Sequence, residues 1–142
     1  MLVQLTTACF LAAANAYTLP PAVLYGILRV EGGRVGMATQ NNDQRRSQDL
    51  GPFQINTVWL RTFTIYWRLP DQQTTYRILR DDGCANALAA AAILRYHLLA
   101  TNDLETAVGR YHAGPAGSAA EAARYLRSYR YVLRYGRLPP RG

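Results

Sequence analysis

The sequence predicts a mainly α-helical domain with an irregular or small β region at about residues 33–55. Apolar residues recur at helical spacing along most of the chain, and residues that cap helices stand in front of several of these segments. The stretch 33–52 differs because it is polar, rich in Gly, Asn, Gln and Arg, and has no helical period. Its length is typical of a loop with a function.

The composition indicates one ordinary globular domain. The chain has 142 residues, of which 49% are hydrophobic and 18% charged, and it shows no repeat or linker. We therefore expect a single domain over 1–142 with its core at about 9–135. No run of apolar residues reaches membrane-spanning length in the sequence, so we expect no membrane span.

Prolines separate the first two predicted helices. Residues 9–17 are rich in Ala, and Pro20-Pro21 then opens a second helix, in whose first turn a missing N–H costs nothing. This helix runs to Glu31, and Gly32-Gly33 stops it. Residues 1–16 also imitate a secretory signal, but they lack its positive start and polar residues interrupt the apolar part. We interpret this segment as a first helix.

Four further helices follow from capping residues and periodicity. The second of them is the richest in Ala, which implies close approach of neighbouring helices and a central place. They run from a cap at Asn56 to before Pro70, from Asp81 or Asp82 through residues 86–99, from Asn102 or Asp103 to Tyr111 or His112, and over about 119–135.

The net charge indicates which class of partner the protein binds, and the cysteines bear on its metal content and its compartment. The net charge is +7 and all 16 basic residues are Arg, which favours a polyanionic partner: nucleic acid, an anionic membrane or a carboxylate-bearing wall polymer. Cys9 and Cys84 have no metal-ligand spacing, so we expect no metal site. They are either two buried thiols or one disulfide that closes a long loop and indicates an oxidising compartment.

Glu31 is the candidate catalytic acid. It ends an apolar helix just where two glycines turn the chain, so its charge should be poorly solvated and its pKa raised, which suits a proton donor. Tyr111, near the end of a later helix, is a candidate donor of a hydrogen bond to a substrate or to Glu31. The alternative interpretation of Tyr111 is a half-buried packing residue. The alternative interpretation of its neighbour His112 is an ordinary surface residue.

An amide-bearing loop is the second candidate site. Gln54 and Asn56 offer donors and acceptors that suit N-acetyl sugars, although this string taken alone favours a plain loop-to-helix junction with Asn56 as cap. Asp43 and Asp49 precede this loop, and we interpret them first as loop and capping residues. If either stood opposite Glu31, an inverting hydrolase would become plausible.

These strings together resemble one family, the soluble lytic transglycosylases among the lysozyme-like muramidases. The family motifs look like Glu-Ser at a helix end, then Gly-Leu-Met-Gln-Ile, then Ala-Tyr-Asn-Ala-Gly-Pro. In the same order this chain has Val30-Glu31-Gly32, Gly51-Pro52-Phe53-Gln54-Ile55-Asn56 and Arg110-Tyr111-His112-Ala113-Gly114-Pro115, and its residues 121–126 are similar to a further family segment, Glu-Thr-Arg-x-Tyr-Val. The resemblance covers about 9–135.

The resemblance implies a lysozyme-like α+β fold and cleavage of the β-1,4 bond between N-acetylmuramic acid and N-acetylglucosamine. Glu31 would act first as acid and then as base, which leaves a 1,6-anhydro sugar and needs no cofactor. The implied substrate-binding residues are Phe53, Gln54, Asn56, Tyr111, His112 and Tyr125. The partner is then the glycan strand of peptidoglycan.

The match is best with the small single-domain branch that accompanies conjugation and type IV or type III secretion systems. Members of this branch have a disulfide at similar places, so the resemblance implies that Cys9 and Cys84 are bonded. A disulfide in turn implies that the protein works in the periplasm or cell envelope. Components of such an apparatus are expected as further partners, nucleic acid is not, and we expect a monomer.

Three departures from the family pattern allow a rival reading, an inactive relative kept as a scaffold. Gly32 stands where the family has Ser, Pro52-Phe53 where it has Leu-Met, and His112 where it has Asn.

The other rival is a basic binding module built on the last helix. Tyr125, Tyr129 and Val132-Leu133 share one face of this helix, and Arg127, Arg130 and Arg134 occupy another. Such a helix either binds nucleic acid through phosphates and stacking, or packs its Tyr face and solvates its Arg face.

Overall fold

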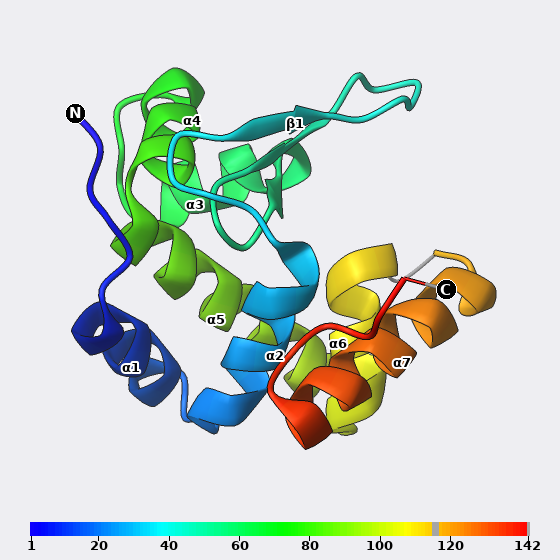
Figure 1. The fold of residues 1–142 in the computed structure, drawn as a ribbon. Coiled ribbons are helices and arrows are strands. Elements are labelled where there is room, and N and C mark those ends of the chain that lie inside the picture. The colour runs from blue at the N-terminus through cyan, green and yellow to red at the C-terminus, as the bar shows by residue number, and fades with distance from the viewer. Residues whose placement is uncertain (115–116, 142) are drawn as a thin grey trace.

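The structure is a computed structural model that describes residues 1–114 and 117–141. Over these residues it is mainly helical with one small antiparallel sheet, as the sequence predicts (Figure 1). The helices are α1 (Thr7–Ala16), α2 (Pro21–Glu31), the 3-10 helix η1 (Thr57–Trp59), α3 (Leu60–Tyr66), α4 (Gln72–Asp81), α5 (Gly83–Thr101), α6 (Leu104–Ala113) and α7 (Ala119–Tyr135). The strands are β1 (Ala38–Gln40), β2 (Gln48–Leu50) and β3 (Ile55–Asn56), in the order β1-β2-β3.

Side-chain caps explain where most helices begin. Asp82 accepts a hydrogen bond from the Ala85 N–H at 3.0 Å, and Asp103 accepts one from Thr106 at 2.9 Å, so these are the caps among the predicted alternatives. One helix, α4, has no counterpart in the prediction. Its sequence is strongly polar, and only its inner side, which includes the buried Leu79, contacts the core.

The Ala-rich helix α5 is central, as predicted. It packs against α1, α4, α6 and β3, and four of its alanines are buried: Ala87, Ala89, Ala90 and Ala91. By length and composition alone α5 could cross a membrane, contrary to our expectation from the sequence, but half of that stretch is buried inside the domain. The bent pair α1 and α2 passes the same test only when taken together, across a bend of 118°. This burial identifies α5 as the core helix of the domain, which passes the length and composition test because of its buried apolar residues.

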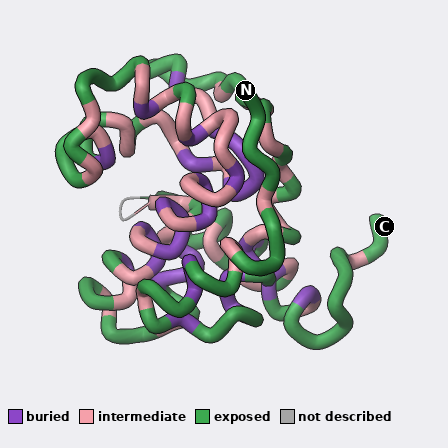
Figure 2. Tube along the Cα trace, turned by 90° about the vertical axis from the view of Figure 1, so that its left-hand side faces the viewer, coloured by how far each residue is buried: buried purple, intermediate pink, exposed green. Residues whose placement is uncertain are grey.

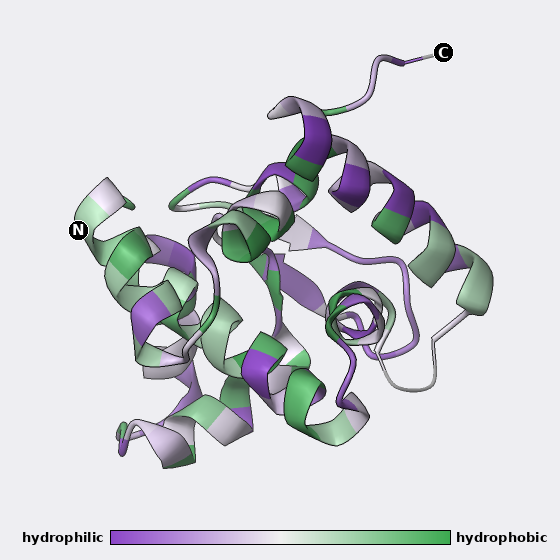
Figure 3. Ribbon diagram, turned by 90° about the horizontal axis from the view of Figure 1, so that it is seen from below, coloured by the Kyte–Doolittle hydropathy of each residue, from purple (hydrophilic) through white to green (hydrophobic). Residues whose placement is uncertain are grey.

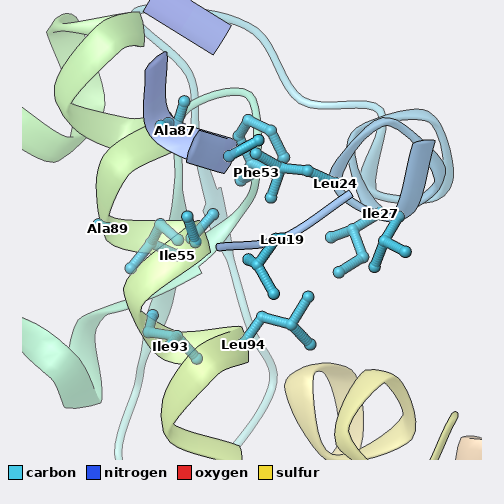
Figure 4. Close-up of a cluster of buried hydrophobic side chains, with 14 of the residues drawn as sticks. Leu19, Leu24, Ile27, Phe53, Ile55, Ala87, Ala89, Ile93 and Leu94 are labelled. Atoms are coloured by element: carbon cyan, nitrogen blue, oxygen red, sulfur yellow. The ribbon is translucent and has the colours of Figure 1, made fainter. Parts of the chain in front are cut away.

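The core joins α2 to the sheet and to α5. Leu24 and Ile27 of α2 meet Phe53 and Ile55 of the β2–β3 region and Leu94 of α5 (Figure 4). Buried residues gather in the middle of the molecule, whereas the β1–β2 turn and the C-terminal segment are exposed (Figure 2). This packing fixes the end of α2 against the loop that follows β2.

A disulfide ties α1 to the start of α5. Cys9 and Cys84 are bonded with their Cα atoms 5.5 Å apart, which decides between the two readings of the cysteines. The segment before α1 lies against the same place, because the Val3 N–H donates to the Asp81 carbonyl and the Val3 carbonyl accepts from Gly83. The N-terminal part of the chain is therefore held to the core at its first helix.

Candidate functional site

A cleft of about 630 Å³ opens between the sheet, the end of α2, α5 and α6. It collects side chains that are far apart in the sequence. Of the residues predicted for the site it is lined by Glu31, Gln54, Asn56, Tyr111 and His112, and it also contains Asp43, Asp49, Trp59, His97 and Arg110.

Close backbone contact brings Glu31 to the amide loop. Gly32 adopts a left-handed conformation (φ 65°) and ends α2, so Glu31 is its last residue. At Gly33 a Cβ atom would lie 2.1 Å from the Gly51 carbonyl oxygen and 2.7 Å from Gln54 Nε2. Only glycine permits this approach, and the N–H of Gly33 donates to the Pro52 carbonyl at 3.2 Å.

The carboxyl of Glu31 has the raised pKa that its position in the sequence predicts. Burial raises the pKa to about 7, the hydroxyl of Tyr125 lowers it, and the negative charge of Asp49 raises it. At neutral pH both protonation states are therefore populated. A single group can then donate a proton and accept one later in the same reaction.

Tyr125 lies beside Glu31, and its hydroxyl has no regular hydrogen-bond partner among the described residues. Its side chain is buried, and its Oη makes no hydrogen bond of regular geometry with any described residue, although it is near enough to lower the pKa of Glu31. That proton is thus available to the carboxylate of Glu31 or to a substrate oxygen. His112 stacks on the Tyr125 ring with centroids 4.6 Å apart and is itself exposed.

Tyr111 supports the loop instead of donating to Glu31. Its hydroxyl donates to the Phe53 carbonyl at 2.9 Å, which ties α6 to the amide loop. Burial and the charges of Glu31 and Asp49 raise the Tyr111 pKa well above its ordinary value, so the hydroxyl keeps its proton. The hydrogen bond to Glu31 that the sequence left open is therefore not formed, and the half-buried side chain fits the alternative of a packing role.

The three predicted residues of the amide loop have different environments and roles in the structure. Phe53 is fully buried in the core and does not line the cleft, so it is not placed to bind substrate as the resemblance implied. Gln54 lines the cleft, and its Nε2 donates to the Gly51 carbonyl at 2.9 Å, which leaves Oε1 for a ligand. Asn56 caps η1 through Val58 and donates to Asp49 at 2.9 Å, so it acts as a cap and also orients a carboxylate of the cleft.

The two aspartates before the loop separate in the structure. Asp43 accepts hydrogen bonds from the backbone and side chain of Ser47, which lower its pKa, and it holds the β1–β2 turn as a loop residue should. Asp49 lies on β2 and lines the cleft, and its negative charge raises the pKa of Glu31. Of the two aspartates that the sequence offered as a possible second carboxylate, Asp49 is therefore the candidate.

Asn86 is a supporting residue that the sequence analysis did not single out. Its side chain is fully buried, donates to the carbonyls of Leu50 and Leu79 at 2.8 Å, and accepts from the Phe53 N–H at 2.8 Å. The signal was present, since Asn86 is a polar residue on the alanine face of a buried helix. His97, about three turns later on the same helix, gives the same signal.

The Tyr face of α7 packs inward. Tyr125, Tyr129 and Val132 are buried, and a Cβ at Gly26 of α2 would lie 2.8 Å from the Tyr129 ring. Hydrophilic residues recur along the rest of the helix (Figure 3), and one of them, Arg130, pairs with Glu105. The buried tyrosines are therefore not free to stack on bases.

Comparison with known proteins gives one family match. The chain matches the protein family described as Transglycosylase SLT domain over residues 8–130. A comparison with curated protein sequences gives no match. The matched range contains all three motif strings and ends inside α7, so it takes in the whole cleft.

Proposed function

The chain belongs to the transglycosylase SLT domain family, and on that premise we propose that it is an active lytic transglycosylase of peptidoglycan. The observation that carries this proposal is the Glu31 carboxyl, with a pKa of about 7, at the end of α2 in the cleft. The cleft also presents Gln54, whose amide suits an N-acetyl sugar.

The proposed mechanism uses Glu31 twice. Its protonated carboxyl donates to the glycosidic oxygen after N-acetylmuramic acid, and the bond from this oxygen to C1 breaks. The acetamido oxygen of the sugar stabilises the positive charge at C1, as in substrate-assisted glycosidases. The Glu31 carboxylate then accepts the proton of the C6 hydroxyl, whose oxygen attacks C1 and forms the 1,6-anhydro ring. No water is consumed.

Asp49 supports a second candidate, hydrolysis. What supports it is that the charge of Asp49 raises the pKa of Glu31 and that Asn56 donates a hydrogen bond to the Asp49 carboxylate. In this candidate reaction Asp49 would activate a water that attacks the opposite face of the sugar. The product would then carry a free reducing end. The two reactions differ by one water in the mass of the product, so one experiment separates them.

The test is digestion of purified peptidoglycan, followed by mass analysis of the released muropeptides. We expect anhydro products from the wild type and a loss of at least about 100-fold in rate for Glu31→Gln, because a general acid contributes that much. Products heavier by one water, abolished in Asp49→Asn, would assign hydrolysis. No release by the wild type, or equal release by Glu31→Gln, would favour the scaffold reading.

We further propose that the enzyme opens the wall locally for a secretion or conjugation apparatus, from the cell envelope. What supports this is the disulfide between α1 and α5, which suits an oxidising compartment and the small single-domain branch that the sequence resembles. A strain without the protein should grow normally but transfer or secrete poorly, and Glu31→Gln should not complement it. Full complementation by Glu31→Gln would contradict the proposal.

A further inference from the structure

The outer side of α7 concentrates positive charge that the reaction in the cleft does not use. This helix packs on α2 and α6 and runs along the edge of the molecule (Figure 3). Between residues 122 and 141 the sequence contains no Asp or Glu, but six of the 16 basic residues of the chain. These six, all exposed, are Arg124, Arg127, Arg130, Arg134, Arg137 and Arg141.

One side of the C-terminal half of α7 combines this charge with tyrosines. Arg127, Tyr131 and Arg134 follow one another at spacings of four and three, so they share a side of the helix, and Tyr135 lies one turn after Tyr131. Arg137, just after the helix, joins them because its guanidinium lies 5.8 Å from the centre of the Tyr131 ring. We call these five residues the basic face.

Aromatic packing holds the guanidinium groups of the basic face in place. The rings of Tyr131 and Tyr135 pack with their centroids 4.6 Å apart. The guanidinium of Arg134 lies 5.4 Å from the centre of the Tyr135 ring, and that of Arg137 lies on the Tyr131 ring. The ion pairs found among the described residues include no arginine of this face. The charge is therefore ordered and uncompensated before a partner binds.

The composition of this region favours a membrane surface over a nucleic acid. Stacking on bases requires an open ring face, whereas the two tyrosines of the basic face pack on each other and on guanidinium groups. Tyr135 is 52% exposed, and Leu138 beyond it is 43% exposed. A Tyr ring with its polar hydroxyl suits the boundary between water and lipid, and an aliphatic side chain adds apolar contact there. Guanidinium groups bind the phosphate oxygens of lipids.

We propose that the basic face binds the surface of a bilayer that contains anionic phospholipids, with Tyr135 and Leu138 at the level of the headgroups. The protein is then a peripheral one, attached through the end of α7. The cleft lies at the other end of this helix, because Tyr125, beside Glu31, precedes Tyr135 by about 15 Å of helix axis. The attached protein thus keeps its cleft accessible to a polymer. Binding to lipid can be measured without any glycan, so this inference does not depend on the proposed reaction.

The test is sedimentation of the purified protein with two kinds of vesicle, one of phosphatidylcholine alone and one of phosphatidylcholine and phosphatidylglycerol in equal parts. We expect binding to the anionic vesicles only, and weaker binding at higher salt because salt screens the attraction. An Arg near an anionic surface contributes a roughly fivefold gain in affinity, so Arg134→Gln/Arg137→Gln should lose about 25-fold. Arg134→Lys/Arg137→Lys should keep most of the binding, since it keeps the charge.

Matched variants control for net charge and for folding. Arg61→Gln/Arg77→Gln removes two exposed guanidinium groups from α3 and α4, lowers the net charge equally, and should change the affinity by less than about twofold. Tyr135→Ser should weaken binding to the anionic vesicles, because it removes an exposed ring. The substituted side chains are exposed, so every variant should keep the melting temperature of the wild type.

Three results would overturn the proposal. The first is equal binding to both kinds of vesicle, or none to either. The second is an equal loss of affinity in Arg61→Gln/Arg77→Gln and in Arg134→Gln/Arg137→Gln, which would mean that net charge alone acts. The third is tighter binding to a DNA oligonucleotide than to the anionic vesicles at the same salt concentration, which would assign the basic face to nucleic acid.

Discussion

At the residue scale, Glu31 shows how one side chain acquires a pKa suited to its task. Packing around the end of α2 removes water from the carboxyl, and Asp49 adds a like charge, while the Tyr125 hydroxyl partly offsets both. The order of these effects matters. Because desolvation is the largest, the folded protein holds a neutral Glu31 more readily than the unfolded chain does.

Glu31→Gln is therefore expected to stabilise the protein at high pH. Below about 4.5 both states carry the proton and the carboxyl has no effect. As the pH rises towards 7, the unfolded state releases the proton while the folded state retains it, so stability is lost. At pH 8 the variant should be more stable by about 2 kcal/mol, allowing for partial exposure to the cleft.

Urea denaturation at pH 8 and pH 4 checks this prediction. The stability difference between Glu31→Gln and the wild type should nearly vanish at pH 4. The exposed Glu121→Gln is the control and should show little change at either pH. A difference of the same size at both pH values would show that the carboxyl is not desolvated in the fold.

At the element scale, the cleft depends on how the loop after β2 is held. This loop carries positive φ values at Gly51 and Gln54, and it runs between the end of α2 and the start of α5. The Asn86 side chain bonds three backbone groups in and beside the loop, and the Tyr111 hydroxyl bonds a fourth, the Phe53 carbonyl. The loop is therefore positioned by hydrogen bonds from two helices rather than by the short sheet.

Asn86→Ala should destabilise the domain by about 2–3 kcal/mol, because it leaves buried backbone groups of Leu50, Phe53 and Leu79 without partners. Activity should fall by more than stability explains, since the loop that carries Gln54 loses its hydrogen bonds to Asn86 at Leu50 and Phe53. Denaturation by urea and the muropeptide assay measure the two effects. Asn15→Ala, at an exposed position of α1, is the matched control. A loss below about 0.5 kcal/mol would mean that water replaces the amide at no cost.

At the scale of the whole molecule, the disulfide joins the first helix to the central one. It closes a loop with a sequence separation of 75, for which the chain-entropy model gives about 4.5 kcal/mol and measured cases commonly 2–4. The backbone hydrogen bonds of Val3 lie beside it. Reduction should thus loosen the N-terminal segment without breaking the packing of α2 on α7.

Thermal unfolding with and without reductant tests this prediction. We expect a lower melting temperature on reduction, and the same decrease in a Cys9→Ser/Cys84→Ser double variant, whose own melting should be unaffected by reductant. A thiol assay on the native protein should find no reactive thiol. Two reactive thiols in the native state would rule out the bond.

Much of the fold was predictable because its helices carry local signals. Prolines opened α2, glycines closed it, and Asp82 and Asp103 capped α5 and α6. The helix α4 was missed although it carries local signals: Asp71 caps it through Thr74, and its apolar residues lie on one face. Its mostly polar composition hid these signals, and only the structure shows that the buried Leu79 anchors this face on the core.

The sequence by itself determined the helical class and the family motifs, because each depends on neighbours along the chain. It also predicted the direction of the Glu31 pKa shift, although burial and the charge of Asp49, which raise that pKa, arise only when the chain packs. The tertiary structure alone decided that Phe53 is buried, that Tyr111 donates to the loop, that Asp49 and His97 line the cleft with Glu31, and that Asn86 supports the loop from behind. These outcomes depend on which backbone and side-chain groups meet after packing. Such meetings join residues too distant in the chain for local patterns to specify.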